Sequence, residues 1–197
     1  MALLMEELKQ AIQLWGRGIG SEIVKVDMFL NHRIDVKLLT QMGQAFYKAF
    51  CDEQVDVVLT IEASGIAAAV ATAQAFGSIP VVFAKKSETA NVGKDAYMSR
   101  VYSFTHRKEN MIRVSKDYLQ AGQRVLIIDD FLANGEAVDG LRDIVNQAGC
   151  TLVGVGICIE KGFQPGGKRL RDSGIKVASL AIIDAIENGK IIVRQGG

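Results

Sequence analysis

Two adjacent aspartates, Asp129 and Asp130, directly follow the apolar run Val125 to Ile128. On a strand, neighbouring side chains point to opposite faces, and a buried carboxylate is costly unless a cation or a hydrogen-bond donor meets it. At the carboxyl end of a strand, both side chains would bend into a crevice, where sugar hydroxyls or a hydrated Mg²⁺ would satisfy them. The alternative is a turn in which the aspartates cap backbone N–H groups.

The loop after the acidic pair offers backbone rather than side chains. Ala133, Asn134, Gly135, Glu136 and Ala137 open what reads as a helix, whose first N–H groups have no internal partner and carry partial positive charge. Small residues let a phosphate approach such groups closely, provided that Glu136 points away and contributes only its amide. In the alternative interpretation, Asn134 is an ordinary helix N-cap.

The same pattern occurs a second time, after the apolar run that ends at Ile61. There Glu62, Ala63, Ser64 and Gly65 lead into another helix. Two such sites at neighbouring strand ends predict a ligand with two separated phosphate groups. Neither loop matches the P-loop or the dinucleotide-binding glycine pattern, which disfavours both of those classes.

The elements that must position these loops alternate between strands and helices. Continuous apolar strands in such an alternation predict a parallel sheet covered by helices on both faces, with ligands beyond the carboxyl ends of the strands. Helices are expected around residues 3–14, 38–50 and 66–76, and between Gly135 and Gly149. The expected strands are Val55–Ile61, Pro80–Lys85, Val125–Ile128, Leu152–Ile159 and Val177–Ile183. The polar, aperiodic stretch from Lys86 to Arg100 is interpreted as a lid or binding loop.

The composition indicates a single compact domain over residues 1–197. The chain is 49% hydrophobic and 23% charged, so it has enough apolar residues for a core. Lys and Arg number 23 against 22 Asp and Glu, which gives a net charge of +1 and no broad basic surface for nucleic acid. An N-terminus with Glu6 and Glu7, and the lack of an apolar run near ~20 residues, predict a cytoplasmic protein without a membrane span.

Cysteine and histidine residues give no sign of a metal site. Cys51, Cys150 and Cys158 are widely spaced without a C-x-x-C pattern, and are interpreted as single buried thiols. His32 and His106 lie far apart without matched ligand spacing, so neither is assigned a metal or catalytic role. We therefore expect no metal bound by the protein side chains alone.

Several segments together resemble the type I phosphoribosyltransferases, and among these the enzymes that act on xanthine. The acidic pair, small loop and helix resemble the motif that binds phosphoribosyl diphosphate (PRPP) in this family. The resemblance extends from about Leu8 to Gln195. It is carried by KVDMFLNH (25–32), TIEASGIA (60–67), VYSFT (101–105), VLIIDDFLANGEA (125–137) and IEKGFQPG (159–166).

This resemblance implies a role for each motif. Residues Ala133 to Ala137 would hold the 5′-phosphate of PRPP, and Asp129 and Asp130 would face the ribose hydroxyls. The Glu62 to Gly65 loop would approach the diphosphate, with Mg²⁺ bound alongside PRPP. The base pocket would contain Val24, Asn31, Lys161 and Phe163, under a small N-terminal hood formed by residues 1–37.

In this interpretation, Lys161 would hydrogen-bond an exocyclic oxygen of the purine and Phe163 would cover its ring, while Asn31 would contact the second carbonyl of xanthine. Each residue also has a plainer alternative, since Lys161 could be a solvated lysine, Phe163 a core residue and Asn31 a turn residue. The resemblance implies a homodimer that makes xanthosine 5′-monophosphate and pyrophosphate. The alternatives are a hypoxanthine/guanine phosphoribosyltransferase and a PRPP-sensing regulator without turnover.

Overall fold

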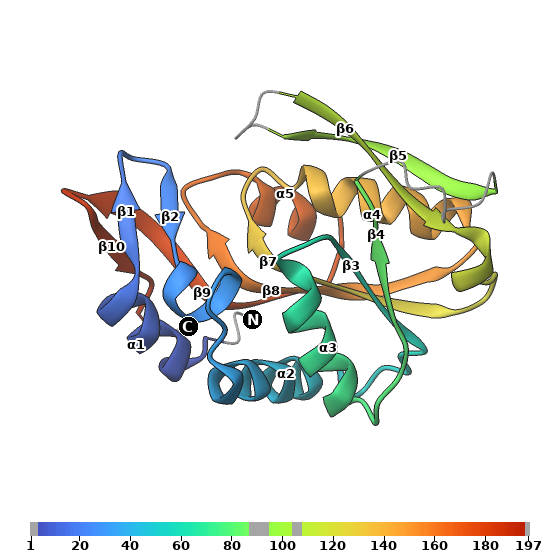
Figure 1. Ribbon diagram of the computed structural model, residues 1–197, viewed down its shortest axis with the longest axis horizontal. Coiled ribbons are helices and arrows are strands. Elements are labelled where there is room, and N and C mark those ends of the chain that lie inside the picture. The colour runs from blue at the N-terminus through green and yellow to red at the C-terminus, as the bar shows by residue number, and fades with distance from the viewer. Residues whose placement is uncertain (1–3, 87–94, 104–107, 196–197) are drawn as a thin grey trace.

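A six-stranded sheet forms the centre of the molecule, with helices above and below it in Figure 1. The computed structural model describes residues 4–86, 95–103 and 108–195. The strand order is β10-β9-β8-β7-β3-β4, and within this sheet β10 alone runs antiparallel to its neighbour. The predicted parallel sheet is therefore confirmed, with an antiparallel strand added at one edge. Its strands are β3 (Val57–Ile61), β4 (Val81–Ala84), β7 (Arg124–Leu132), β8 (Thr151–Lys161), β9 (Val177–Glu187) and β10 (Lys190–Val193).

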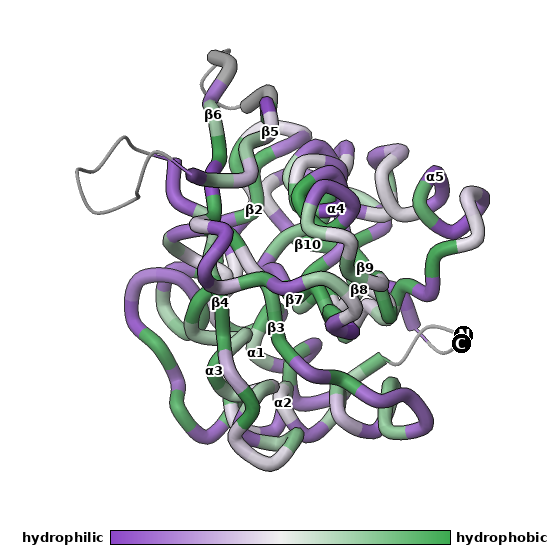
Figure 2. The backbone as a smooth tube through the Cα atoms, turned by 90° about the vertical axis from the view of Figure 1, so that its right-hand side faces the viewer, coloured by the Kyte–Doolittle hydropathy of each residue, from purple (hydrophilic) through white to green (hydrophobic). Residues whose placement is uncertain are grey.

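Alternate residues of the central strands supply two hydrophobic clusters, one on each face of the sheet. In β7, Leu126 and Ile128 belong to one cluster, and Val125 and Ile127 belong to the other, as strand geometry requires. Figure 2 shows these central strands as mainly hydrophobic segments, while hydrophilic segments gather in the peripheral loops. Helices α1 (Glu6–Trp15), α2 (Val36–Phe50) and α3 (Gly65–Ala75) cover the first face, and α4 (Glu136–Gln147) and α5 (Gly166–Asp172) cover the second (Figure 1).

Helix α2 shows how local sequence sets these elements. The Asp35 carboxylate accepts the Leu38 N–H at 3.0 Å and so caps the first turn. Its buried residues recur at helical spacing and pack against the sheet; they are Leu38, Met42, Gly43, Phe46 and Phe50. None of the described helices is long and apolar enough to cross a membrane.

A two-stranded antiparallel ribbon, β5 (Ala96–Ser103) and β6 (Lys108–Ser115), lies over α4 at the top of Figure 1. The close approach depends on Gly140 of α4, because a side chain there would collide with Val101 and would come within 3.1 Å of Ile112. The ribbon is therefore seated on the same helix whose first turn follows the acidic pair.

The prediction of an aperiodic loop from Lys86 to Arg100 is wrong for its last part, because residues 96–100 belong to β5. Residues 87–94 lie outside the described residues. Strand pairing with β6 organises the end of the stretch, and Gln147 holds it from α4: its Nε2 donates to the Met98 carbonyl at 2.8 Å. Those partners are distant in sequence, so local periodicity carries no sign of them.

The N-terminal region adds a hairpin and one π-helical turn that the sequence did not predict. Strands β1 (Arg17–Ile19) and β2 (Ile23–Lys25) pair antiparallel, and the turn spans Asp27–Asn31. The Gly18 N–H donates to the Gly189 carbonyl at 3.0 Å, which ties the hairpin to the last two strands of the sheet. Within residues 4–37, this arrangement is the one predicted to form a hood, and that role stays a prediction.

The other predicted elements are confirmed with shifted ends, and one difference affects the site. Strand β7 continues to Leu132, whereas the sequence predicted its end at Ile128. Pairing of Phe131 with Ile159 and of Leu132 with Glu160 extends the ladder past the two aspartates. Helix α5 and strand β10 were missed because each is short and lacks a long apolar period.

We expect the Asp35→Ala substitution to lower the free energy of unfolding by about 1 kcal/mol, because it leaves an N–H of α2 without its cap. Urea unfolding measures this loss. Asp35→Ser is the matched control, since it keeps an acceptor at the cap and should lose much less. Equal losses in the two variants would contradict the capping role.

Candidate active site

The residues predicted to do chemistry follow neighbouring strands of the sheet. Strand β7 pairs with β8 on one side and with β3 on the other, and all three run parallel. Lys161 ends β8, the small loop from Ala133 follows β7, and Glu62 follows β3. These groups therefore share one edge of the sheet, the edge at which ligands of open α/β sheets bind.

The acidic pair lies inside β7 rather than just beyond it. Asp129 and Asp130 are 4% and 7% exposed. Asp129 Oδ1 accepts the Asp130 N–H at 2.9 Å, and Asp130 Oδ2 accepts from Asn31 Nδ2 at 3.5 Å. The turn alternative is wrong, because the ladder with β8 continues beyond both residues.

The surroundings of Asp129 favour its protonated form. Burial, and after it the neighbouring Asp130 carboxylate, raise the pKa of Asp129 well above its ordinary value, while the charge of Lys86 acts in the opposite direction. Thr60 Oγ1 is also buried, and has no hydrogen-bond partner among the described residues. A side chain at Gly65 would collide with Thr60 Oγ1 and would come within 2.9 Å of Asp129 Oδ1, so these polar atoms border the same small space. A buried polar atom without a protein partner is usually hydrogen-bonded to a ligand or to bound water.

The loop after β7 presents free backbone donors. Its carbonyls are all used: Ala133 O accepts from Gly166 N at 3.1 Å, Asn134 O from Arg169 Nη2 at 2.9 Å, and Gly135 O from Asp139 N at 2.9 Å. By contrast, none of the N–H groups from 133 to 137 has an acceptor among the described residues. This set of donors at the start of a helix of 12 residues is suited to an anion.

Asn134 is not the N-cap of α4, so that alternative is wrong. The capping position is Gly135, which has a φ of 97° and makes no side-chain cap. A left-handed conformation of this kind favours glycine, since other side chains are strained there. It also lets the guanidinium of Arg169 come close, because a side chain at Gly135 would lie 2.6 Å from Arg169 Nη2.

The loop after β3 has a similar form. Ser64 is the N-cap of α3 and makes no side-chain cap, and Ala63 and Ser64 are exposed. Glu62 Oε1 accepts the Lys86 N–H at 2.5 Å, and the Glu62 N–H donates to Ala84 O at 3.0 Å. The Glu62 carboxylate is therefore drawn toward the next strand, and the small residues are left open at the end of the sheet.

The residues of the predicted base pocket meet the N-terminal hairpin. Lys161 Nζ donates to the Glu22 carbonyl at 2.7 Å, and burial lowers the pKa of Lys161. Lys161 is therefore half-buried and bonded to the hairpin, which disfavours the solvated-lysine alternative. Val24 is buried in the hairpin, whereas Phe163 packs against the hydrophobic core, as its plainer alternative expected. The Asn31 bond to Asp130 joins the same region to the acidic pair.

Sequence reasoning missed several groups around the site. The Phe131 ring lies 5.9 Å from Lys161 Nζ, and only its place beside the acidic pair could have suggested it. Arg169 binds the Asn134 carbonyl and forms an ion pair with Asp139 at 2.5 Å. The hydrogen bonds that Arg169 donates to the Asp139 carboxylate, and also the nearby Glu136 carboxylate, raise the pKa of Arg169. These partners lie far from Arg169 in sequence, so no local pattern marks it.

An ion pair between the buried Glu160 and the half-buried Arg171 secures the end of β8 next to Lys161. Glu160 is 4% exposed, receives two hydrogen bonds from Arg171 at 2.8 and 2.6 Å, and accepts a third from Ser179 Oγ. Burial would raise the pKa of Glu160, but the bonds from Arg171 and Ser179 outweigh it and lower the pKa. This network ties α5 to β8 and β9.

The possible metal ligands and the cysteines of the described residues form no metal site by their side chains alone. No cluster of three or more His, Cys, Asp or Glu side chains suited to a metal occurs among the described residues, and His106 lies outside them. The three cysteines are free, but only Cys158 is buried, so the prediction of buried thiols is wrong for Cys51 and Cys150. Burial, followed by the charges of the acidic pair, raises the pKa of Cys158 and keeps it an inert thiol.

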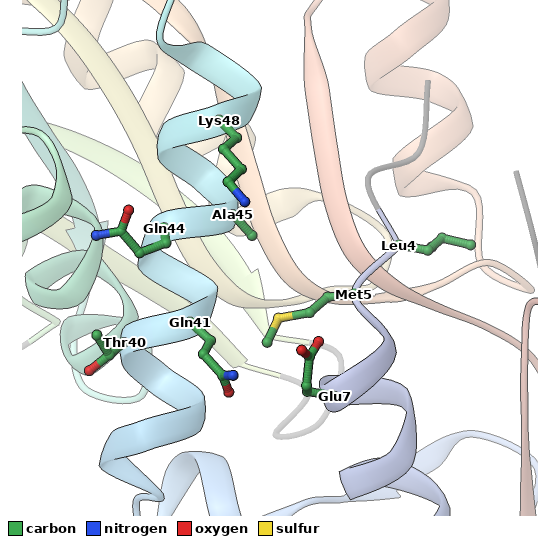
Figure 3. A pocket seen from close by; sticks show the side chains of 8 residues that line it. All are labelled: Leu4, Met5, Glu7, Thr40, Gln41, Gln44, Ala45 and Lys48. Atoms are coloured by element: carbon green, nitrogen blue, oxygen red, sulfur yellow. The ribbon is translucent and has the colours of Figure 1, made fainter.

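A cavity of about 380 Å³ lies away from this edge, between α1 and α2. Figure 3 shows Glu7 and Met5 on one side and Gln41 and Lys48 on the other. None of the predicted site residues lines this cavity, so we assign it no part in the chemistry.

Comparisons with known proteins agree with this architecture. Residues 26–189 match the family model described as the phosphoribosyl transferase domain. The chain is 55% identical over 187 residues to the xanthine phosphoribosyltransferase of Ruminiclostridium cellulolyticum, covering 95% of this chain and 98% of that protein. It is 50% identical over 190 residues to the xanthine phosphoribosyltransferase of Clostridioides difficile, with coverages of 96% and 100%. The crystal structure of the adenine phosphoribosyltransferase from Rhodothermus marinus superposes with a TM-score of 0.72 at 24% identity, covering 90% and 97%, which supports the fold alone.

We expect Asp129→Asn to raise the melting temperature of the ligand-free protein at ~pH 8. When folding raises the pKa of a carboxyl, the folded protein loses stability as pH rises from the ordinary pKa toward the raised one. Asparagine does not ionise, so the variant avoids this loss. A gain of about 1 kcal/mol would shift the midpoint by roughly 2–4 °C for a chain of this size.

The advantage of Asp129→Asn should shrink as pH falls through about 4, the ordinary pKa of an aspartate, because below it the wild-type carboxyl is protonated in both states. Thermal melts over that pH range test this, with Asp52→Asn at an exposed turn as the control. A wild-type protein that melts higher at ~pH 8 would contradict the expectation.

Proposed function

The chain belongs to the phosphoribosyl transferase family, and on that premise we propose that it transfers the 5-phosphoribosyl group from PRPP to xanthine. The products are xanthosine 5′-monophosphate and pyrophosphate. The carrying observation is that relatives named xanthine phosphoribosyltransferase share 50–55% identity with this chain over nearly its full length. The order of the groups along the sheet edge supports the same reaction, with Lys161 at the end of β8, the acidic pair near the end of β7 and the small loop after β3.

The base is recognised between β8 and the N-terminal hairpin. Lys161 donates to an exocyclic oxygen of the purine, exchanging its bond to the Glu22 carbonyl for one to the base. Asn31 is directed at the second carbonyl, which separates xanthine from hypoxanthine, and Val24 supplies an apolar wall. The Phe131 ring, over which Lys161 Nζ lies, is a further surface for the purine ring. Phe163 covers the ring in this proposal from its place against the hydrophobic core.

The sugar and its 5′-phosphate lie at the end of β7. The N–H groups from 133 to 137 bind the phosphate oxygens, and the start of α4 adds partial positive charge. Asp129 and Asp130 accept hydrogen bonds from the ribose hydroxyls, which add to the one hydrogen bond that each buried side chain accepts within the described residues. The Asn31 bond to Asp130 supports adjacent binding of the base and the sugar.

The diphosphate lies over the start of α3, at Glu62, Ala63, Ser64 and Gly65. Mg²⁺ prefers carboxylate, phosphate and water oxygens, and the buried pair Asp129 and Asp130 forms no ion pair within the described residues, so this edge fits the ion. When bound with PRPP, the ion supplies positive charge that the departing diphosphate needs.

The reaction breaks the bond from ribose C1′ to the diphosphate oxygen and forms a bond from C1′ to N9 of xanthine, with loss of the N9 proton. The bond pair leaves with the pyrophosphate, and the sugar passes through oxocarbenium character. This protein contributes alignment of C1′ with N9, and carboxylates near the positive sugar, rather than a nucleophile. A homodimer in the cytoplasm is the assembly and location that family resemblance suggests, and both belong to this proposal.

Purified protein mixed with PRPP, Mg²⁺ and separate purine bases tests the proposed substrate. We expect nucleotide formation from xanthine at least about tenfold faster than from hypoxanthine, guanine or adenine, since a base without the second carbonyl leaves the Asn31 amide without its partner, at a cost of roughly 1–3 kcal/mol. Fastest turnover of hypoxanthine or guanine would replace the substrate and keep the family reaction. PRPP binding without any product would instead favour a PRPP-sensing regulator.

We expect Lys161→Ala to raise the KM for xanthine by about 10- to 100-fold while the KM for PRPP changes little, because the lost group is a charged donor to the base. Initial rates with each substrate varied in turn measure both constants. Lys190→Ala, on the exposed end of β10, is the matched control. Similar increases in both constants for Lys161→Ala would count against the base-binding role.

A further inference from the structure

Arg169 of α5 holds the loop that follows the acidic pair. Its Nη2 donates to the Asn134 carbonyl at 2.9 Å, and its guanidinium covers Gly135 so closely that a side chain there would lie 2.6 Å away. One turn earlier in the chain, the Gly166 N–H donates to the preceding carbonyl, that of Ala133, at 3.1 Å. Helix α5 therefore binds two successive carbonyls of the loop from outside.

These two bonds determine which way the loop presents its peptide groups. The C=O and N–H of a trans peptide point in opposite directions across the unit. When the Ala133 and Asn134 carbonyls are turned toward α5, the N–H groups that follow them, on Asn134 and Gly135, are turned away from it. Those N–H groups belong to the set that lacks an acceptor in the described structure.

Arg169 also offsets acidic charge beside the loop. Its Nη1 and Nη2 contact the two carboxylate oxygens of Asp139, at 3.2 and 2.5 Å, and Glu136 interacts with it electrostatically. Both carboxylates lie in the first turn of α4, where they would repel a bound phosphate. A guanidinium fork can bind a carboxylate and a carbonyl together, which a lysine ammonium does less well.

We propose that Arg169 is a positioning residue for the 5′-phosphate of the substrate: by binding the Asn134 carbonyl from behind the loop, it directs the loop N–H groups at the phosphate. Arg169 itself need not touch the ligand. The proposal rests on the proposed function, which places the 5′-phosphate at this loop. The other interpretation is that Arg169 only links α5 to α4 through Asp139.

The Arg169→Gln and Arg169→Lys variants test this role, with Lys168→Gln as the matched control. Lys168 is the neighbouring residue on α5, and its side chain is 81% exposed. Within the described part of the chain, it pairs only with Asp172 on the same helix. Two inhibitors separate the two phosphate sites, because ribose 5-phosphate needs the β7 loop whereas inorganic pyrophosphate needs the β3 loop. Each is measured against PRPP, and the KM for xanthine is measured alongside.

For Arg169→Gln, we expect the KM for PRPP and the inhibition constant of ribose 5-phosphate to rise together, by about 10- to 100-fold. The inhibition constant of pyrophosphate and the KM for xanthine should stay within about twofold of wild type, as should every constant of Lys168→Gln. Arg169→Lys should recover only part of the loss, since it restores the charge without the fork. Unchanged ribose 5-phosphate inhibition in Arg169→Gln would overturn the proposal, as would equal losses for both inhibitors.

Asp139→Asn separates positioning from simple helix linkage. It removes the carboxylate that pairs with Arg169 but leaves the Asn134 carbonyl in place, so ribose 5-phosphate should bind as well as in wild type or better. A loss as large as that of Arg169→Gln would show that the link to Asp139 is what matters, and would refute the proposal. If Arg169→Gln does not fold, Arg169→Lys takes its place in this comparison.

Direct calorimetric titration with ribose 5-phosphate distinguishes this proposal from the proposed function. Wild-type protein that binds ribose 5-phosphate, but makes no nucleotide from xanthine, would overturn the substrate while Arg169 is still tested by the same titration of its variants. If wild-type protein does not bind ribose 5-phosphate, the proposed binding of the 5′-phosphate by the β7 loop is wrong, and so is the proposed role of Arg169.

Discussion

Parallel pairing of β7 with β8 and with β3 is the constraint on which the site depends. Because the three strands run in the same direction, their carboxyl ends reach one edge, and the residues that follow them are brought together from positions about 100 residues apart. Lys161, the acidic pair and Glu62 are neighbours for this reason alone. The two hydrophobic clusters on either face hold the sheet in place and leave that edge free for a ligand.

The same edge carries the polar groups that burial makes unfavourable. Asp129 and Asp130 are residues of β7 and are nearly inaccessible to water. The Thr60 hydroxyl is also buried, and has no hydrogen-bond partner among the described residues. A core made only for stability would place apolar residues there. Their presence is explained if the hydroxyls of a bound sugar supply hydrogen bonds and a bound cation offsets the carboxylate charge, which would make the free protein less stable than its ligand complex.

In the loop after β7, the carbonyl groups are hydrogen-bonded, whereas the N–H groups are not bonded within the described residues. Each of its carbonyls has a donor, from Gly166, Arg169 or α4 itself, while its N–H groups have no acceptor within the described part of the chain. This asymmetry makes the loop suited to binding an anion through its backbone alone. It also explains why the short α5 is packed here: Arg169 contacts the loop from outside, and Arg171 binds the buried Glu160 to secure the helix.

The sequence by itself determined the alternation of apolar strands and helices, the two small-residue loops and the acidic pair, because each is a local pattern of residue types. It did not determine where β7 ends, since pairing with β8 carries the strand past the aspartates to Leu132. The β5–β6 ribbon and the N-terminal hairpin were equally hidden, because distant partners stabilise them. Only the tertiary structure decided that Glu22 meets Lys161, that Asn31 meets Asp130 and that Arg169 meets Asn134. These contacts join residues 35 to 139 positions apart, and local residue patterns do not record separations of that length.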